Sequence, residues 1–212
     1  MTMTKRASRI TWGFLLGIIL LEGWAVLASF RAHGNFAAAL WRYASTPPGT
    51  PLAWGMATLV TTAYAAYAAS ASPIIRDHML RPARWRPFAA IRIVAVPMAL
   101  ISGFFEEAFF RKALMDYVMH RGAGIVVQLA ITATIFGAAH AIWGLMSRSV
   151  RGALGAMAAT SILGGALGVI YIVGGRSIGP CMAAHVAINL LIEPWLILAA
   201  ATHDWRQQKS DA

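Results

Sequence analysis

Long apolar runs separated by short polar or basic stretches dominate the hydrophobic pattern of this chain. A transmembrane helix needs about 20 predominantly apolar residues, and runs of about this length recur from one end of the sequence to the other. We predict six spans, at residues 10–30, 52–72, 91–119, 125–143, 152–174 and 178–201. The pattern therefore predicts an all-α fold, a polytopic transmembrane helical bundle of about six spans.

The third predicted span, 91–119, is too long for a simple crossing and carries charged residues. We expect it to be tilted, or interrupted near Gly103. In the predicted span 152–174, Gly164 and Gly168 lie one helical turn apart. Small residues at this spacing let membrane helices approach closely, so we expect tight packing against a neighbouring helix there.

Composition supports the membrane assignment and limits the partners. Of 212 residues, 58% are hydrophobic and 12% are charged, whereas a soluble domain is about half apolar and a quarter charged. The net charge is +10, but the basic residues are spread between the apolar runs. We interpret them as topology signals and headgroup contacts, and expect no nucleic-acid partner. Cys181 is the single cysteine, so the chain forms no internal disulfide.

The distribution of lysine and arginine predicts the orientation. With the N-terminus inside, most basic residues fall on the inner side, and the outer side holds only Arg31, Arg42, Arg121 and Arg176. We therefore expect an integral protein of a bacterial cell (inner) membrane with both termini cytoplasmic.

The N-terminus allows two interpretations. Lys5, Arg6 and Arg9 precede the apolar stretch 12–30, in which residues 26–28 resemble a signal-peptidase site. A cleaved signal peptide is therefore an alternative to a retained first helix. The stretch is long enough to span and further spans follow, so we favour the retained helix.

Four formal charges lie within the apolar segment 104–112, FFEEAFFRK. An ionised group at the centre of a bilayer helix costs about 2.5–3.5 kcal/mol, so these groups must be paired, neutralised, hydrated or close to an interface. Glu107 and Arg111 have the i,i+4 spacing that allows an ion pair on one helix face. Glu106 points about 100° away and has no such partner, while Lys112 can extend toward an interface.

Two further polar pairs have the same spacing. His140 follows Phe136 by one helical turn in FGAAH, and His185 and Asn189 share a helix face in HVAIN. Each set alone is compatible with a structural hydrogen bond or ion pair between helices. The sets lie in different predicted spans, so a shared polar cavity would bring them together and reduce the cost of burying them.

These residues carry a resemblance to a known family. The sequence EEAFFR at 106–111 resembles the EExxxR motif of the CAAX-protease and bacteriocin-processing (CPBP, or Abi) family. Residues 136–140 resemble its FxxxH motif and residues 185–189 its HxxxN motif, in the same order. The resemblance covers about residues 91–200. We accordingly divide the chain into N-terminal transmembrane helices with a basic interfacial loop (1–90), a catalytic core (91–201) and a solvated tail (202–212).

The resemblance implies an intramembrane endopeptidase that cleaves a membrane-associated protein or peptide. By the family's roles, Glu106 would be the general base and His140 its partner on the attacking water. His185 and Asn189 would form the oxyanion hole.

The family's roles also make Glu107 and Arg111 structural supports of the site. The partners implied are the lipid bilayer and a protein or peptide substrate, which in the eukaryotic association is a prenylated CAAX protein. The substrate of this chain is not identified by its sequence.

Three rival interpretations stay open. His140, His185 and a carboxylate would supply three ligands to a catalytic zinc, although HExxH is absent and the family mechanism is metal-free. We therefore expect no cofactor, with zinc as the alternative. Cys181 lies four residues before His185, the arrangement of a Cys–His nucleophile, although a lone membrane cysteine is more often a small apolar residue. The third rival is a non-proteolytic protein on the same fold, a transporter or an immunity or scaffold protein, which Glu22 and Glu193 fit as further intramembrane carboxylates.

The depths of the motif residues do not align. With straight helices that rise about 1.5 Å per residue, Glu106 falls near mid-membrane, His140 toward the inner side and His185 toward the outer side. A re-entrant or broken segment within 141–177 would remove this mismatch.

Overall fold

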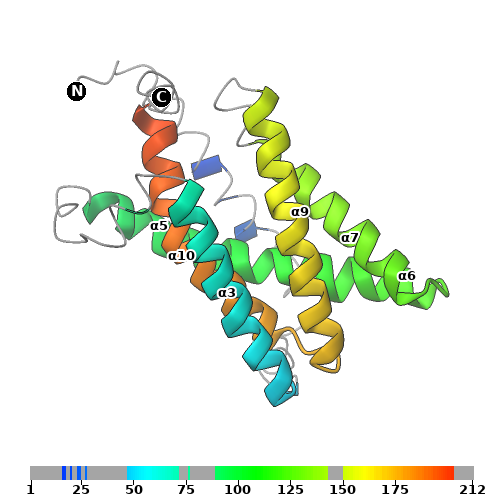
Figure 1. The fold of residues 1–212 in the computed structure, drawn as a ribbon. Coiled ribbons are helices and arrows are strands. Elements are labelled where there is room, and N and C mark those ends of the chain that lie inside the picture. The colour runs from blue at the N-terminus through cyan, green and yellow to red at the C-terminus, as the bar shows by residue number, and fades with distance from the viewer. Residues whose placement is uncertain are drawn as a thin grey trace.

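A computed structural model describes residues 47–71, 89–142 and 150–202, together with isolated positions between 16 and 27 and at 76. The elements are α3 (Pro51–Ala71), α5 (Ala89–Glu107), the π-helical segment η2 (Ala108–Met115), α6 (Asp116–His120), α7 (Ile125–His140), α9 (Val150–Val173) and α10 (Gly179–Thr202) (Figure 1). The described residues contain no strand, which confirms the all-α class.

Four of the predicted spans coincide with α3, α7, α9 and α10 to within three residues at each end. The predicted first span, 10–30, lies largely outside the described residues. Because α9 is a continuous helix, the part of the chain that it covers contains no broken segment.

The third predicted span corresponds to a continuous helical path through α5, η2 and α6. The predicted interruption near Gly103 is wrong, because the chain stays α-helical to Glu107 and only then opens into the π-helical segment. Gly103 instead allows close packing: a Cβ there would lie 2.7 Å from Cγ2 of Val186 on α10. The small residue therefore brings α5 against α10 without breaking the helix.

Close packing between helices holds the bundle together. Helix α7 packs along α9, and α10 packs against both α5 and α3. A Cβ on Gly164 would lie 2.9 Å from Cδ1 of Phe136, and a Cβ on Gly168 would lie 2.7 Å from Cδ2 of Leu129. These distances confirm the predicted tight packing at Gly164 and Gly168.

By length and composition, two described stretches can cross a membrane, Ile125–Ile142 and Val150–Val173. The count of six spans is therefore not confirmed within the described part of the chain. Helix α3 contains threonine, tyrosine and serine, and the α5–η2–α6 path carries charged residues. Both features lower the mean hydropathy.

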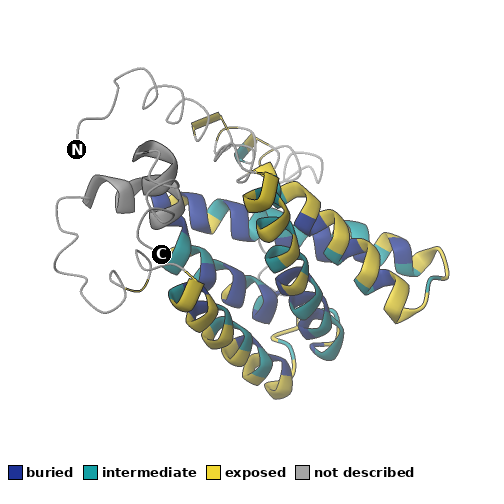
Figure 2. Ribbon diagram, turned by 45° about the horizontal axis from the view of Figure 1, so that its top comes forward, coloured by how far each residue is buried: buried dark blue, intermediate teal, exposed yellow. Residues whose placement is uncertain are grey.

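The distribution of polar and apolar side chains fits a lipid environment. Large apolar side chains are exposed along the outer faces of the helices, with Val126 at 78% and Ile162 at 74%, whereas Glu107, Arg111 and His185 are at most 1% exposed (Figure 2). Extensive exposed apolar surface is unfavourable in water, and intramembrane charges face the interior of a bundle. The arrangement supports an integral membrane protein.

Candidate active site

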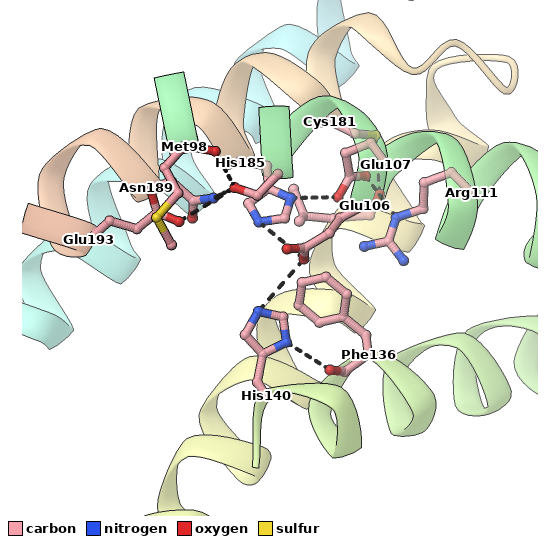
Figure 3. A network of polar contacts seen from close by, with 12 residues as sticks. Met98, Glu106, Glu107, Arg111, Phe136, His140, Cys181, His185, Asn189 and Glu193 are labelled. Carbon is pink, nitrogen blue, oxygen red and sulfur yellow. Dashed lines mark hydrogen bonds and ion pairs between the residues drawn. The ribbon is translucent and has the colours of Figure 1, made fainter. Parts of the chain in front are cut away.

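Side chains from three helices converge on Glu106. Glu106 is the penultimate residue of α5, His140 is the last residue of α7, and His185 lies in the second turn of α10. The Oε2 atom of Glu106 lies 3.6 Å from Nε2 of His140 and 3.7 Å from Nε2 of His185 (Figure 3). The fold thus brings together the three residues that the sequence distributed over separate spans.

The depth mismatch came from the assumption of parallel, straight helices. In Figure 1 the α5–η2–α6 path runs across α10 rather than alongside it. Its position along the sequence therefore does not translate directly into a depth, and no broken segment in α9 is needed to bring Glu106 to both histidines.

The second nitrogen of each imidazole has a partner of its own. Nδ1 of His140 lies 2.8 Å from the carbonyl oxygen of Phe136, and Nδ1 of His185 lies 2.8 Å from Oε1 of Glu107. Carbonyl and carboxylate oxygens accept hydrogen bonds, so each Nδ1 carries the hydrogen and donates it. In its neutral form, each ring therefore directs an Nε2 lone pair toward Glu106.

The Oε2 atom of Glu106 is buried and has no hydrogen-bond partner within the described part of the chain. Its distances to the two Nε2 atoms are too long for direct hydrogen bonds. Three acceptors that face one point require a donor between them, since a buried acceptor without a donor is unfavourable. A bridging water or an additional imidazole proton meets this requirement.

Glu107 links two neighbours. Its Oε2 accepts a hydrogen bond from Nε of Arg111 at 2.9 Å, and both side chains are 0% exposed, which confirms the predicted i,i+4 pair. Its Oε1 accepts from His185. The carboxylate therefore holds the His185 ring, and Arg111 balances its charge.

The ring of Phe136 packs against both histidines. Phe136 is fully buried, and its ring centroid lies 4.5 Å from that of His140 and 5.6 Å from that of His185. The guanidinium carbon of Arg111 lies 5.5 Å from the same centroid. In the sequence, Phe136 was notable only for its spacing to His140, whereas in the structure its aromatic surface fixes both imidazoles.

Asn189 lies one turn beyond His185, and its amide contacts a residue that the sequence analysis missed. Its Nδ2 donates to Oγ of Ser102 on α5 at 3.2 Å. Ser102 Oγ also lies 2.8 Å from the carbonyl oxygen of Met98 and 3.4 Å from Oε1 of Glu193 (Figure 3). The signal was present in the sequence, because Ser102 precedes Glu106 by one helical turn and so lies on the same face.

The rival interpretations depend on Cys181, on a metal site and on Glu22. Cys181 is 0% exposed in the apolar core, and its Sγ contacts the carbonyl oxygen of Leu167 at 3.3 Å. Within the described residues, no group of three histidine, cysteine, aspartate or glutamate side chains has the arrangement of a metal site. Glu22 lies outside the described residues.

A second polar network lies at the end of the bundle where α6 meets α7. Asp116 accepts hydrogen bonds from the Tyr171 hydroxyl at 3.0 and 3.1 Å and pairs with Arg176. Arg176 also donates to Oε1 of Gln128 at 2.6 Å. Lys112, which we expected to extend toward an interface, lies with Nζ 5.7 Å from the Tyr171 ring centroid. Arg176, which we expected only as a topology signal, is therefore part of this network.

Comparison with known proteins identifies one family. The model of the family described as type II CAAX prenyl endopeptidase Rce1-like matches residues 88–191. The matched segment contains Glu106, His140, His185 and Asn189, and the match confirms the resemblance seen in the sequence motifs. No curated protein and no solved structure matches the chain.

Proposed function

Because the chain belongs, through residues 88–191, to the type II CAAX prenyl endopeptidase Rce1-like family, we propose that it is an intramembrane endopeptidase that uses Glu106 as its base. The catalytic core is residues 91–201, and the substrate is a membrane-associated protein or peptide. The protein lies in a bacterial cell membrane with both termini cytoplasmic, which a GFP or PhoA fusion after Asp204 tests.

Catalysis begins with a water held between Glu106 and His140. The water donates one hydrogen toward Oε2 of Glu106 and the other toward Nε2 of His140, atoms that lie 3.6 Å apart. Glu106 takes the proton as the water oxygen bonds to the scissile carbonyl carbon. It then delivers the proton to the leaving nitrogen as the C–N bond breaks, the usual sequence for a general base that becomes a general acid.

His185 and Asn189 stabilise the oxyanion of the tetrahedral intermediate. His185 already donates from Nδ1 to Glu107, so it donates from Nε2 only when its ring is doubly protonated. The carboxylates of Glu106 and Glu107 supply the negative charge that balances such a cation. Asn189 donates from a neutral amide, and fixed donors of this kind are most effective where water is excluded.

The convergence of Glu106, His140 and His185 from three helices is the observation that carries this proposal. Neither a structural ion pair nor a scaffold requires a carboxylate oxygen to face imidazole Nε2 atoms from two other helices at distances too long for direct hydrogen bonds. Glu107 and Arg111 support the site, because together they hold His185 in place.

The test compares the wild-type protein with Glu106→Gln in proteoliposomes on a fluorogenic farnesylated CAAX peptide, together with peptidomics of membrane and secreted peptides from cells. We expect Glu106→Gln to reduce cleavage by about 10²–10⁴-fold with unchanged insertion and melting temperature. Cys181→Ser is the matched control and should retain full activity.

Four outcomes would contradict the proposal. Equal cleavage by the wild type and Glu106→Gln would overturn the role of Glu106 as the base. Absence of cleavage in the wild type would favour a transporter or scaffold. Loss of activity in Cys181→Ser would favour a thiol nucleophile. Stoichiometric zinc in the active protein, with activity lost on chelation and restored by zinc, would replace the metal-free mechanism.

A further inference from the structure

Ser102 lies between the proposed catalytic helix and the amide of Asn189. It is 4% exposed, one helical turn before Glu106 on α5. Its Oγ accepts a hydrogen bond from the Asn189 amide nitrogen at 3.2 Å. The contact joins α5 to α10 within the same polar cluster as His185 (Figure 3).

The direction of this hydrogen bond follows from the hydrogens available. A serine hydroxyl has a single hydrogen to donate. The carbonyl oxygen of Met98 lies 2.8 Å from Oγ, closer than Oε1 of Glu193 at 3.4 Å. With its hydrogen directed at Met98, Ser102 can only accept from Asn189. The group of Asn189 that faces Ser102 must therefore be the amide nitrogen rather than the amide oxygen.

An asparagine amide has two nearly isosteric ends, and only one of them can stabilise an oxyanion. The nitrogen carries two hydrogens, so one can donate to Ser102 while the second stays available to the substrate. A flip of the amide by 180° would present its carbonyl oxygen instead, which repels an oxyanion. The Ser102 acceptor distinguishes between these two orientations.

We propose that Ser102 is a positioning residue that holds the amide nitrogen of Asn189 in the donor orientation required for the oxyanion. The proposal rests on the proposed function, in which Asn189 stabilises the tetrahedral intermediate. Ser102 itself does not contact the reacting atoms. It acts through Asn189, and the effect of its removal therefore depends on whether Asn189 is present.

The first test observes the amide without any substrate. The chain contains two asparagines, Asn35 and Asn189, so ¹⁵N-asparagine labelling in nanodiscs gives two side-chain amide signals, and Asn189→Ala assigns them. Ser102→Ala should shift the Asn189 signal and accelerate its hydrogen exchange, whereas Ser102→Thr, which keeps the hydroxyl, should preserve it. Thr160→Ala is the matched control, because it also removes a hydroxyl that donates to the carbonyl four residues earlier.

The second test is a double-mutant cycle on the farnesylated CAAX peptide. Loss of one neutral hydrogen bond predicts a kcat about five- to tenfold lower for Ser102→Ala, with KM nearly unchanged. Asn189→Ala should lower kcat by about 10²-fold. In the Asn189→Ala background, Ser102→Ala should change kcat by less than about twofold, since residues that act through one another are not additive.

The two tests distinguish failure of the Ser102–Asn189 contact, of the positioning role and of the proposed function. An unchanged Asn189 amide signal in Ser102→Ala would overturn the contact. Equal losses from Ser102→Ala with and without Asn189 would overturn the positioning role and leave only a structural one. Equal cleavage by the wild type and Glu106→Gln would overturn the proposed function instead, and the amide signals would still decide whether Ser102 orients Asn189.

Discussion

Glu106 and Glu107 are adjacent in the sequence, yet their side chains have different surroundings. Glu107 is fully buried and accepts hydrogen bonds from both Arg111 and His185. Glu106 is 15% exposed at its side chain and faces two imidazole nitrogens that lie too far away for direct hydrogen bonds. The carboxylate of Glu107 thus has a structural role, whereas that of Glu106 is available to bind a water molecule.

We predict that the single substitution Arg111→Leu destabilises the protein. The substitution leaves the Glu107 carboxylate buried without its cationic partner, and breaking such a pair costs about 3–5 kcal/mol. Thermal or denaturant unfolding in detergent should detect this loss. The double variant Glu107→Leu/Arg111→Leu should recover much of the stability but stay inactive, because His185 loses the acceptor for Nδ1. Wild-type stability of Arg111→Leu would contradict the prediction.

Among the helices, the interface between α7 and α9 determines where His140 lies. Gly137 sits between Phe136 and His140, and a Cβ there would lie 2.5 Å from the carbonyl oxygen of Met157 and 1.9 Å from Oγ of Ser161 on α9. The clash with backbone cannot be relieved by a side-chain rotation. The separation of the two helices at this level therefore depends on the absence of a side chain at position 137.

We predict that Gly137→Ala forces α7 away from α9 and moves His140 from Glu106. Overpacking of this kind costs about 1–3 kcal/mol, and cleavage should fall by at least about tenfold because the water would lose one of its acceptors. Gly165→Ala is the matched control on the same interface, since its Cβ would meet only Cβ of Ala133 at 3.8 Å. Equal activity and melting temperature for the two variants would contradict the prediction.

The π-helical segment η2 is a second structural element that adjoins the site. It begins directly after Glu107 and contains Arg111. Segments of this kind within α-helices are frequent at functional sites. Here the chain departs from α-helical geometry next to the residue proposed as the base, while the Glu107–Arg111 pair is maintained across the transition.

In the part of the molecule that the structure describes, the proposed site and the network around Asp116 hold together helices that are apolar elsewhere. The proposed site joins α5, α7 and α10. The network of Asp116, Tyr171, Arg176 and Gln128 joins α6, α7, α9 and the turn before α10. Because the second network contains no residue of the proposed site, we infer that it serves stability.

Arg176→Ala should therefore lower the melting temperature in detergent while retaining most of the activity per folded molecule. Hydrogen bonds to charged groups contribute about 1.5–3 kcal/mol each, and Arg176 makes two of them to Asp116 and Gln128. Arg121→Ala is the matched control, since Arg121 is an exposed arginine whose guanidinium lies over the Tyr117 ring at 5.1 Å. A larger decrease for Arg121→Ala than for Arg176→Ala would contradict this assignment.

The sequence predicted the features of this protein that depend on nearby residues. The apolar runs predicted α3, α7, α9 and α10, because helical hydrophobic patterns are local. The spacing of Glu107 and Arg111 predicted their pair, since four residues are about one helical turn. The motif residues were recognised by their spacing and their order.

The tertiary structure alone decided which polar groups meet. Glu107 and His185 are 78 residues apart, and Ser102 and Asn189 are 87 residues apart. Such contacts depend on the direction in which α5 crosses α10 and on how closely glycines let the helices approach. The hydrophobic pattern of a single helix specifies neither the crossing direction nor the distance between two helices. The sequence therefore determined which residues carry polar chemistry into the bundle, and the packing of the helices determined that Glu106 faces two histidines.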